Sequence, residues 1–327
     1  MADSDRQLER KLANIRSGRY TPDDFVIADA KDGDMAFGVM APGPNADGTL
    51  KTKADYLDAI TAMTESGLVD VMLLSASSAE VLSGRGVFES SPVTPAVRMN
   101  DTTDIWNARG SRYRDFPSAP FSTADIDSVS SFCDLGLYSM TFSNDLESDR
   151  ASLDAYREFR HTIRPHDFRH FLEVFNPAFD IGIPEAELGD YVNDMIIKAV
   201  AGVTARDTPR FLKIQFNGPQ AMSDLSSYDP ENLIVGILGG AKGTTRDTFE
   251  LAHQAEQSGA RVALFGRKIN LSEAPLELVR LMRATVEQRS TPEQAVRAYH
   301  DYLDEHGIAP QRALADDLQI TDPVLMN

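Results

Sequence analysis

Short apolar runs alternate with longer amphipathic segments along most of this chain. The segments at 53–66, 149–163, 188–203 and 245–260 carry apolar residues near helical spacing. Alternating strands and helices imply parallel strands joined by right-handed crossovers. Eight runs have the composition of buried strands, namely FVIADA (25–30), VDVMLLSA (69–76), PVTPAVRMN (92–100), LYSMTFSN (137–144), HFLEVFNP (170–177), RFLKIQFN (210–217), LIVGILGG (233–240) and RVALFGR (261–267).

Eight such units favour an α/β fold, a single (β/α)8 TIM barrel, with an open doubly wound sheet as the alternative. We expect one domain over residues 1–327, with an extra N-terminal helix, a barrel core from about 24 to 289, and a C-terminal helix and tail over 290–327. In that extension, Thr291 is predicted to cap a helix that starts at Pro292 and ends at Gly307. The loop 100–122, which holds Trp106, Arg109, Arg112 and Arg114, is either a surface excursion or a lid or subunit contact.

Composition and charge narrow the class of protein. The chain is 42% hydrophobic, and it contains no apolar run near the roughly 18 residues of a membrane-spanning helix. A net charge of −18 argues against a nucleic-acid partner, because such affinity comes mostly from Lys and Arg at phosphates. The single cysteine, Cys133, and a charged N-terminus without an apolar signal segment indicate the cytoplasm.

The sixth apolar run carries a lysine at its centre. Alternate residues of a strand point to opposite faces, so Leu212, Ile214 and Phe216 form one apolar face. The opposite face holds Lys213 and Gln215. In a barrel of this kind the apolar face packs on the helices, and Lys213 and Gln215 point into the lumen.

Other strands are expected to bring polar side chains to the same lumen. Glu173 on the fifth run and Asp29 on the first are predicted to point inward, with Lys31 on the same face as Asp29. The fourth run contributes small polar residues, beginning with Ser139. Lys213, Glu173 and Asp29 together are too costly to bury for packing alone, because buried charges are rare unless they are paired.

Glycine turns follow the last two predicted strands. Gly239 and Gly240 lead into a helix in LGGAKGTTRD, and Gly266 and Arg267 follow the eighth run in FGRKI. Phosphate sites on barrels are often built from the loops after strands seven and eight. We therefore expect backbone N–H groups of these turns and the start of the helix near 245 to face an anion.

The segments FLKIQFNGP, FLEVFNP, IADAKDGDMAFG and ILGGAKGTTRDTFELAHQAEQSGARVALFGRKI resemble the class I, lysine-dependent aldolases. The similarity is to the tagatose-bisphosphate and sulfofructose-phosphate aldolases and to the archaeal-type fructose-bisphosphate aldolases. This resemblance implies a barrel lyase and a homo-oligomer, with Lys213 as the Schiff-base nucleophile, Glu173 as the acid/base and Asp29 as the first-strand carboxylate. It also implies a phosphate clasp at Gly239, Gly240, Gly266 and Arg267, with Lys31, Lys242 and Gln215 beside the substrate.

Schiff-base chemistry is consistent with these residue types. A free lysine, with a pKa of about 10.4, must be deprotonated before it attacks a carbonyl, and desolvation or a nearby cation favours the neutral amine. The iminium then serves as the electron sink, so we expect neither a metal nor a cofactor, and the six histidines show no ligand spacing. Two alternatives stay open: an isomerase or epimerase that uses Asp29 and Glu173 without a covalent step, and a non-catalytic sugar-phosphate binding barrel.

Overall fold

The computed structural model describes residues 6–45, 47–105 and 108–326. Eight parallel strands close into a barrel in the order β1-β10-β9-β8-β7-β6-β3-β2, so the predicted TIM barrel is confirmed over the open sheet. Each predicted run overlaps one strand of the barrel. The strands are β1 (Val26–Lys31), β2 (Val71–Leu74), β3 (Thr94–Arg98), β6 (Leu135–Thr141), β7 (Arg169–Phe175), β8 (Leu212–Ile214), β9 (Gly236–Leu238) and β10 (Val262–Phe265).

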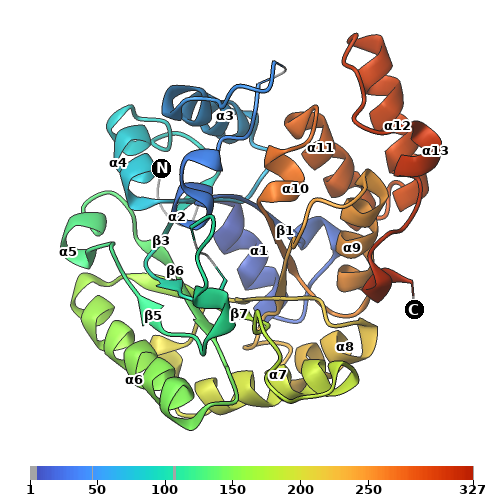
Figure 1. Cartoon of the computed structure of the whole chain (residues 1–327). Helices are drawn as coiled ribbons and strands as arrows, with labels where there is room; N and C mark the ends of the chain where they lie inside the picture. Colours follow the sequence, from blue (N-terminus) through green and yellow to red (C-terminus); the bar gives the residue numbers. More distant parts are fainter. Residues whose placement is uncertain (1–5, 46, 106–107, 327) are drawn as a thin grey trace.

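Helices surround this barrel, as Figure 1 shows. The outer ring contains α3 (Lys53–Ser66), α4 (Ala76–Gly84), α5 (Ile126–Val129), α6 (Leu146–Ile163), α7 (Glu185–Val200), α8 (Pro219–Tyr228), α9 (Thr245–Gln257) and α11 (Pro275–Val286). Short helices follow two strands, α2 (Gly33–Phe37) after β1 and α10 (Arg267–Asn270) after β10. The described residues also form single 3-10 turns: η2 (Pro22–Asp24), η3 (Gly38–Met40), η4 (Tyr113–Asp115), η5 (Arg164–His166), η6 (Ala205–Asp207) and η7 (Pro323–Leu325).

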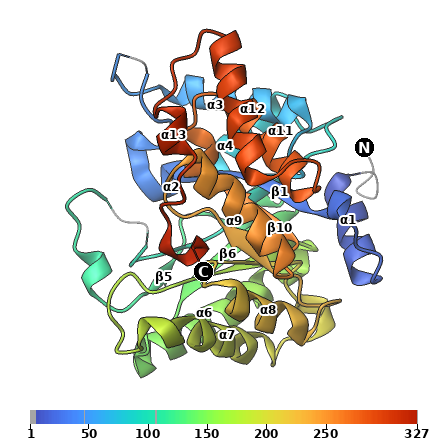
Figure 2. The same ribbon diagram turned by 90° about the vertical axis from the view of Figure 1, so that its right-hand side faces the viewer.

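Both predicted extensions are present. Helix α1 (Gln7–Arg16) inserts Leu8, Leu12 and Ile15 among the lumen side chains and lies at the opposite end of the barrel from the loop around β5 (Figure 2). At the C-terminus, α12 (Pro292–Glu305) packs on α9 and α11 and is followed by α13 (Leu314–Asp317). The Thr291 side chain accepts from the backbone N–H of Gln294, as its capping role requires.

The core has two parts that follow the alternation of the strands. Inward side chains such as Val26, Leu137 and Phe171 fill the lower lumen with the apolar face of α1. Outward side chains such as Ile27, Leu212 and Ile214 pack with the surrounding helices. The polar residues near the carboxyl ends of the strands therefore lie above an apolar floor.

Gly236 is required by the close approach of β9 to its neighbours. A Cβ atom there would lie 2.6 Å from the carbonyl oxygen of Leu212 and 2.7 Å from the Cβ atom of Val262. Because β8 and β10 are backbone-paired on either side, Gly236→Ala is expected to lower the free energy of unfolding by about 2 kcal/mol. Urea unfolding should show this loss. Gly202→Ala should leave the free energy of unfolding nearly unchanged, because a Cβ atom at Gly202 would have no atom within 4 Å. Equal stability of the two variants would contradict the expectation.

Candidate active site

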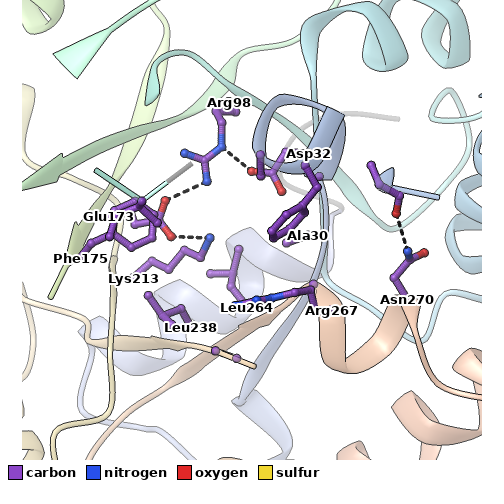
Figure 3. A pocket seen from close by; sticks show the side chains of 18 of the residues that line it. Ala30, Asp32, Arg98, Glu173, Phe175, Lys213, Leu238, Leu264, Arg267 and Asn270 are labelled. Atoms are coloured by element: carbon purple, nitrogen blue, oxygen red, sulfur yellow. Dashed lines mark hydrogen bonds and ion pairs between the residues drawn. The ribbon is translucent and has the colours of Figure 1, made fainter. Parts of the chain in front are cut away.

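A cavity of about 840 Å³ opens at the carboxyl ends of the strands. This is the end of a (β/α)8 barrel at which active sites are built. Figure 3 shows polar side chains from several strands pointing into it. Its lining includes Ala30 from β1, Arg98 from β3, Glu173 and Phe175 from β7, Lys213 from β8, Leu238 from β9 and Leu264 from β10.

Lys213 and Glu173 are neighbours in this cavity. They occupy paired positions of the parallel strands β8 and β7, so their side chains leave the sheet on the same side. The Nζ atom of Lys213 lies 2.6 Å from Oε1 of Glu173, and both side chains are at most 5% exposed. The predicted inward direction of Lys213, Glu173 and Gln215 is confirmed, and all three line the cavity.

A buried arginine that the sequence analysis did not single out holds this pair in place. Arg98, fully buried at the end of β3, donates from Nη2 to Oε2 of Glu173 at 2.9 Å and from Nη1 to Oγ of Ser139 at 2.7 Å. The hydroxyl of Ser139 also donates to Oε2 of Glu173, at 2.7 Å. Period-two alternation from Ala96, which faces the lumen, places Arg98 on the inner face and is the signal that was available.

The second carboxylate of the cavity is Asp32, the residue just before α2. Its Oδ2 atom accepts from Nε of Arg98 at 2.5 Å, and its side chain is only 8% exposed. Burial favours the neutral acid, but the charges of Arg98 and Lys213 outweigh it and lower the pKa of Asp32. Asp32 is thus held as a carboxylate at the rim of β1.

Asp29 lies outside the cavity, which corrects its expected place in the lumen. Val26 and Ala28 belong to the inner core and Ile27 to the outer one, so Asp29 points outward with Ile27. It is completely buried, and Nζ of Lys31 lies 3.3 Å from its Oδ2 atom. Burial raises the pKa of Asp29, against the effect of Lys31. The residue that lines the cavity from this strand is Ala30.

The four residues of the expected phosphate clasp meet at one side of the cavity. Gly239, Gly240, Gly266 and Arg267 all line it, and Gly240 has a left-handed φ of 65°. A Cβ atom at Gly266 would lie 3.0 Å from the carbonyl oxygen of Ala30, so a larger residue would crowd β1. The guanidinium of Arg267 lies 5.2 Å from the centre of the Phe37 ring, a cation–π distance.

Two lysines assigned to the substrate are not among the lining residues. Lys31 donates to Oδ1 of Asn270 at 3.0 Å and reaches the cavity only through that amide, which does line it. Lys242 donates to the carbonyl of Leu271 at 2.5 Å and to the side chain of Gln311. Lys31 and Lys242 therefore contact the surrounding loops and lie outside the cavity lining.

The start of α9 is also unavailable to a ligand. The backbone N–H of Thr245 donates to Oδ1 of Asp317 at 2.8 Å, and Asp247 accepts from the backbone of Thr244 and Thr321. His300 on α12 contacts the other carboxylate oxygen of Asp317 at 2.9 Å. The C-terminal extension thus occupies the helix terminus that we expected to face an anion.

The long loop after β3 forms part of the cavity wall. Strands β4 (Asp101–Thr102) and β5 (Pro120–Phe121) pair antiparallel at its base. Ile105 and Arg114 from this loop line the cavity. Trp106 lies outside the described residues.

The described residues contain neither a cluster of metal ligands nor a helix that could span a membrane. Within residues 6–45, 47–105 and 108–326, no group of three or more His, Cys, Asp or Glu side chains is placed to hold a metal ion. In the same ranges, no helix has both the length and the apolar character that crossing a bilayer requires.

Comparison with known proteins finds similarity at the level of structure. No family model matches the chain, and no curated protein matches its sequence. A Schiff-base-forming fructose-1,6-bisphosphate aldolase superposes with a TM-score of 0.61 at 14% identity, over 85% of this chain and 99% of its own. The fructose-bisphosphate aldolase of Slackia heliotrinireducens gives 0.63 at 12% identity, over 92% of each chain.

A third solved structure is similar to the same extent. It is an archaeal fructose-1,6-bisphosphate aldolase whose catalytic lysine is covalently bound to the carbinolamine intermediate of its substrate. It gives a TM-score of 0.58 at 14% identity, over 86% of this chain and 99% of its own. The chain therefore has the barrel fold of the Schiff-base fructose-bisphosphate aldolases.

Proposed function

We propose that this protein is a class I aldolase-like carbon–carbon lyase that acts on a phosphorylated ketose or keto compound. The observation that carries the proposal is the buried contact of 2.6 Å between Nζ of Lys213 and Oε1 of Glu173 at the mouth of the barrel. A lysine in that position has a proton acceptor beside it and a cavity in front of it. The carboxylate can take the proton that the amine must lose before it attacks a carbonyl.

The covalent steps use the amine of Lys213. The amine adds to the ketone carbon of the substrate, and the resulting carbinolamine loses its hydroxyl group as water to give an iminium. A neighbouring C–C bond then breaks as the hydroxyl on the departing carbon gives up its proton and becomes an aldehyde carbonyl. The electron pair of that bond moves to the iminium and forms an enamine, which takes a proton on carbon before water releases the ketone product and the amine.

The two cavity carboxylates supply the proton transfers. Glu173 touches Lys213 and is placed to take the proton of the amine and to return it to the carbinolamine hydroxyl as water leaves. Asp32 is held as a carboxylate on the β1 side of the cavity and is placed to accept the proton of the substrate hydroxyl. In this proposal Asp32, and not Asp29, is the carboxylate that the first strand and its loop contribute to the site.

A phosphate on the substrate is supported by the turns after β9 and β10. Gly239, Gly240 and Gly266 bring backbone into the cavity wall, and Arg267 adds a cation. We further propose that the protein is a homo-oligomer and that it works in the cytoplasm. A single cysteine that is free and buried is in keeping with that compartment, and burial raises the pKa of its thiol to about 12. An isomerase would have to use Glu173 and Asp32 without a covalent step.

The test is borohydride reduction in the presence of dihydroxyacetone phosphate, followed by intact-mass measurement and peptide mapping. A single reduced adduct on the peptide that contains Lys213 is expected. If no adduct forms while phosphate ligands still raise the melting temperature, the lyase proposal fails and a binding barrel or a non-covalent isomerase takes its place.

A pair of amide substitutions distinguishes the two aspartates of the first strand and its loop. Asp32→Asn is expected to lower kcat by about 10²-fold, because the amide cannot accept the hydroxyl proton. Asp29→Asn should leave kcat within about threefold and change mainly the melting temperature, because Asp29 faces away from the cavity. Steady-state kinetics on both purified variants checks this, and the reverse ranking would restore Asp29 to the site.

A further inference from the structure

Arg98 is a buried cation with carboxylates around it. Its side chain is 1% exposed, and its guanidinium faces three carboxylates: Asp32 at 2.5 Å, Glu173 at 2.9 Å and Asp101 at 3.7 Å. Burial alone would lower the pKa of Arg98, but these carboxylates outweigh it and raise the pKa above its usual value. The cation is therefore permanent, whereas the groups around it can exchange protons.

The contacts of Glu173 are divided between its two oxygens. Oε2 accepts from Arg98 Nη2 at 2.9 Å and from Ser139 Oγ at 2.7 Å. Oε1 faces Lys213 and has no aligned hydrogen bond to any residue that the structure describes. One oxygen is thus anchored by two donors, and the other is left to exchange a proton. Figure 3 shows Arg98 and Lys213 approaching Glu173 from different sides.

Arg98 places a permanent positive charge among these carboxylates. Asp32 and Glu173 contact its guanidinium directly, and Asp101 lies 3.7 Å from it. An iminium on Lys213 would place a second positive charge beside Oε1 of Glu173. Asp101, behind Arg98, has a pKa raised to about 7 by burial, although Arg98 opposes the shift.

We propose that Arg98 is a positioning residue that anchors Glu173 and Asp32 on opposite sides of Lys213 and assigns Oε1 of Glu173 to proton transfer. This inference rests on the proposed lyase function. It acts through geometry, because only the planar fork of an arginine reaches Asp32 from Nε and Glu173 and Ser139 from its two terminal nitrogens. A lysine at this position keeps the charge and loses the fork.

The variants are chosen to separate positioning from folding. Arg98→Lys preserves the charge, and Ser139→Ala removes the other donor to Oε2 of Glu173 without changing any charge. Arg283→Lys is the matched control, because Arg283 is a partly buried arginine paired with Asp70 at 3.0 Å and does not line the cavity. Circular dichroism melts select conditions in which all the variants are folded.

The experiment measures the rate of adduct formation with dihydroxyacetone phosphate between pH 5 and 9, by quenching single-turnover mixtures with borohydride. Arg98→Lys should lower the rate at least tenfold and Ser139→Ala about threefold, with a double variant less impaired than the product of the two effects, because both donors act on one oxygen. The Arg98→Gln variant removes the cation, so the carboxylates that faced it should hold their protons up to a higher pH. The acidic limb of the pH–rate profile should therefore move to higher pH. Arg283→Lys should match the unmodified protein.

Unchanged rate and profile in Arg98→Lys and Ser139→Ala, with normal trapping in the unmodified protein, would overturn the positioning role alone. Absence of trapping in the unmodified protein would overturn the lyase function and this inference together.

Discussion

Lys213→Met is expected to lower turnover by about four orders of magnitude or more and to abolish the borohydride-reducible adduct. Methionine matches much of the length and apolar volume of the lysine stem but has no amine to form the iminium. Glu173 keeps Arg98 and Ser139 as partners in this variant, so the carboxylate is not left unpaired. The melting temperature should therefore change by only a few degrees, which identifies the loss as chemical.

A second lysine makes peptide mapping essential. Burial lowers the pKa of Lys268 to about 8, so its amine is a further buried nucleophile that the mapping must exclude. Lys268 does not line the cavity, and its Nζ atom donates to the carbonyl of Lys242 at 3.2 Å. Lys268→Met should still form the adduct on Lys213. If the Lys213→Met variant still formed the reduced adduct and the Lys268→Met variant did not, the nucleophile would be Lys268.

Glu173→Gln is expected to have the second largest effect, a fall in kcat of about 10³-fold with little change in KM. The amide retains the shape of the carboxylate but cannot exchange the protons that the carbinolamine and the amine require. Arg98 keeps Asp32 as its partner, so the fold should persist. Slow adduct formation, detected by quenching over hours instead of seconds, would show that Lys213 is intact while the proton transfers have failed.

The matched control for this variant is Glu277→Gln. Glu277 on α11 is also a buried glutamate paired with an arginine, Arg280, at 2.5 Å, and it is absent from the cavity lining. Its substitution should leave kcat unchanged. Equal kcat for Glu173→Gln and Glu277→Gln would remove Glu173 from the mechanism and leave Asp32 as the only cavity carboxylate available for acid/base work.

Local sequence patterns were sufficient to predict the barrel and the inward direction of Glu173 and Lys213. Alternation along β7 and β8 places Glu173 and Lys213 on inner faces, and adjacent parallel strands bring the two side chains together. Helix α3 covers the same residues, 53–66, as the segment whose apolar spacing predicts a helix. These features depend on a few neighbouring residues, and for that reason the sequence alone predicts them.

The first strand shows where alternation was not enough. The sequence predicts that Asp29 points inward and that Lys31 shares its face, but the register of β1 turns both outward and places Ala30 in the cavity. A shift of one residue exchanges the two faces of a strand completely. Only the pairing of β1 with β2 and β10 fixes which face is inside.

By itself, the sequence determined the eight-unit barrel, the inward lysine and glutamate, and the glycine turns beside them. The tertiary structure decided the partners that come from distant segments, namely Arg98 bridging Glu173 and Asp32, and the C-terminal tail whose Asp317 caps α9. These contacts join residues 66 to 75 positions apart along the chain. The physical reason is that a periodic pattern records which side of an element is buried, whereas the partner of a buried charge depends on how the barrel closes.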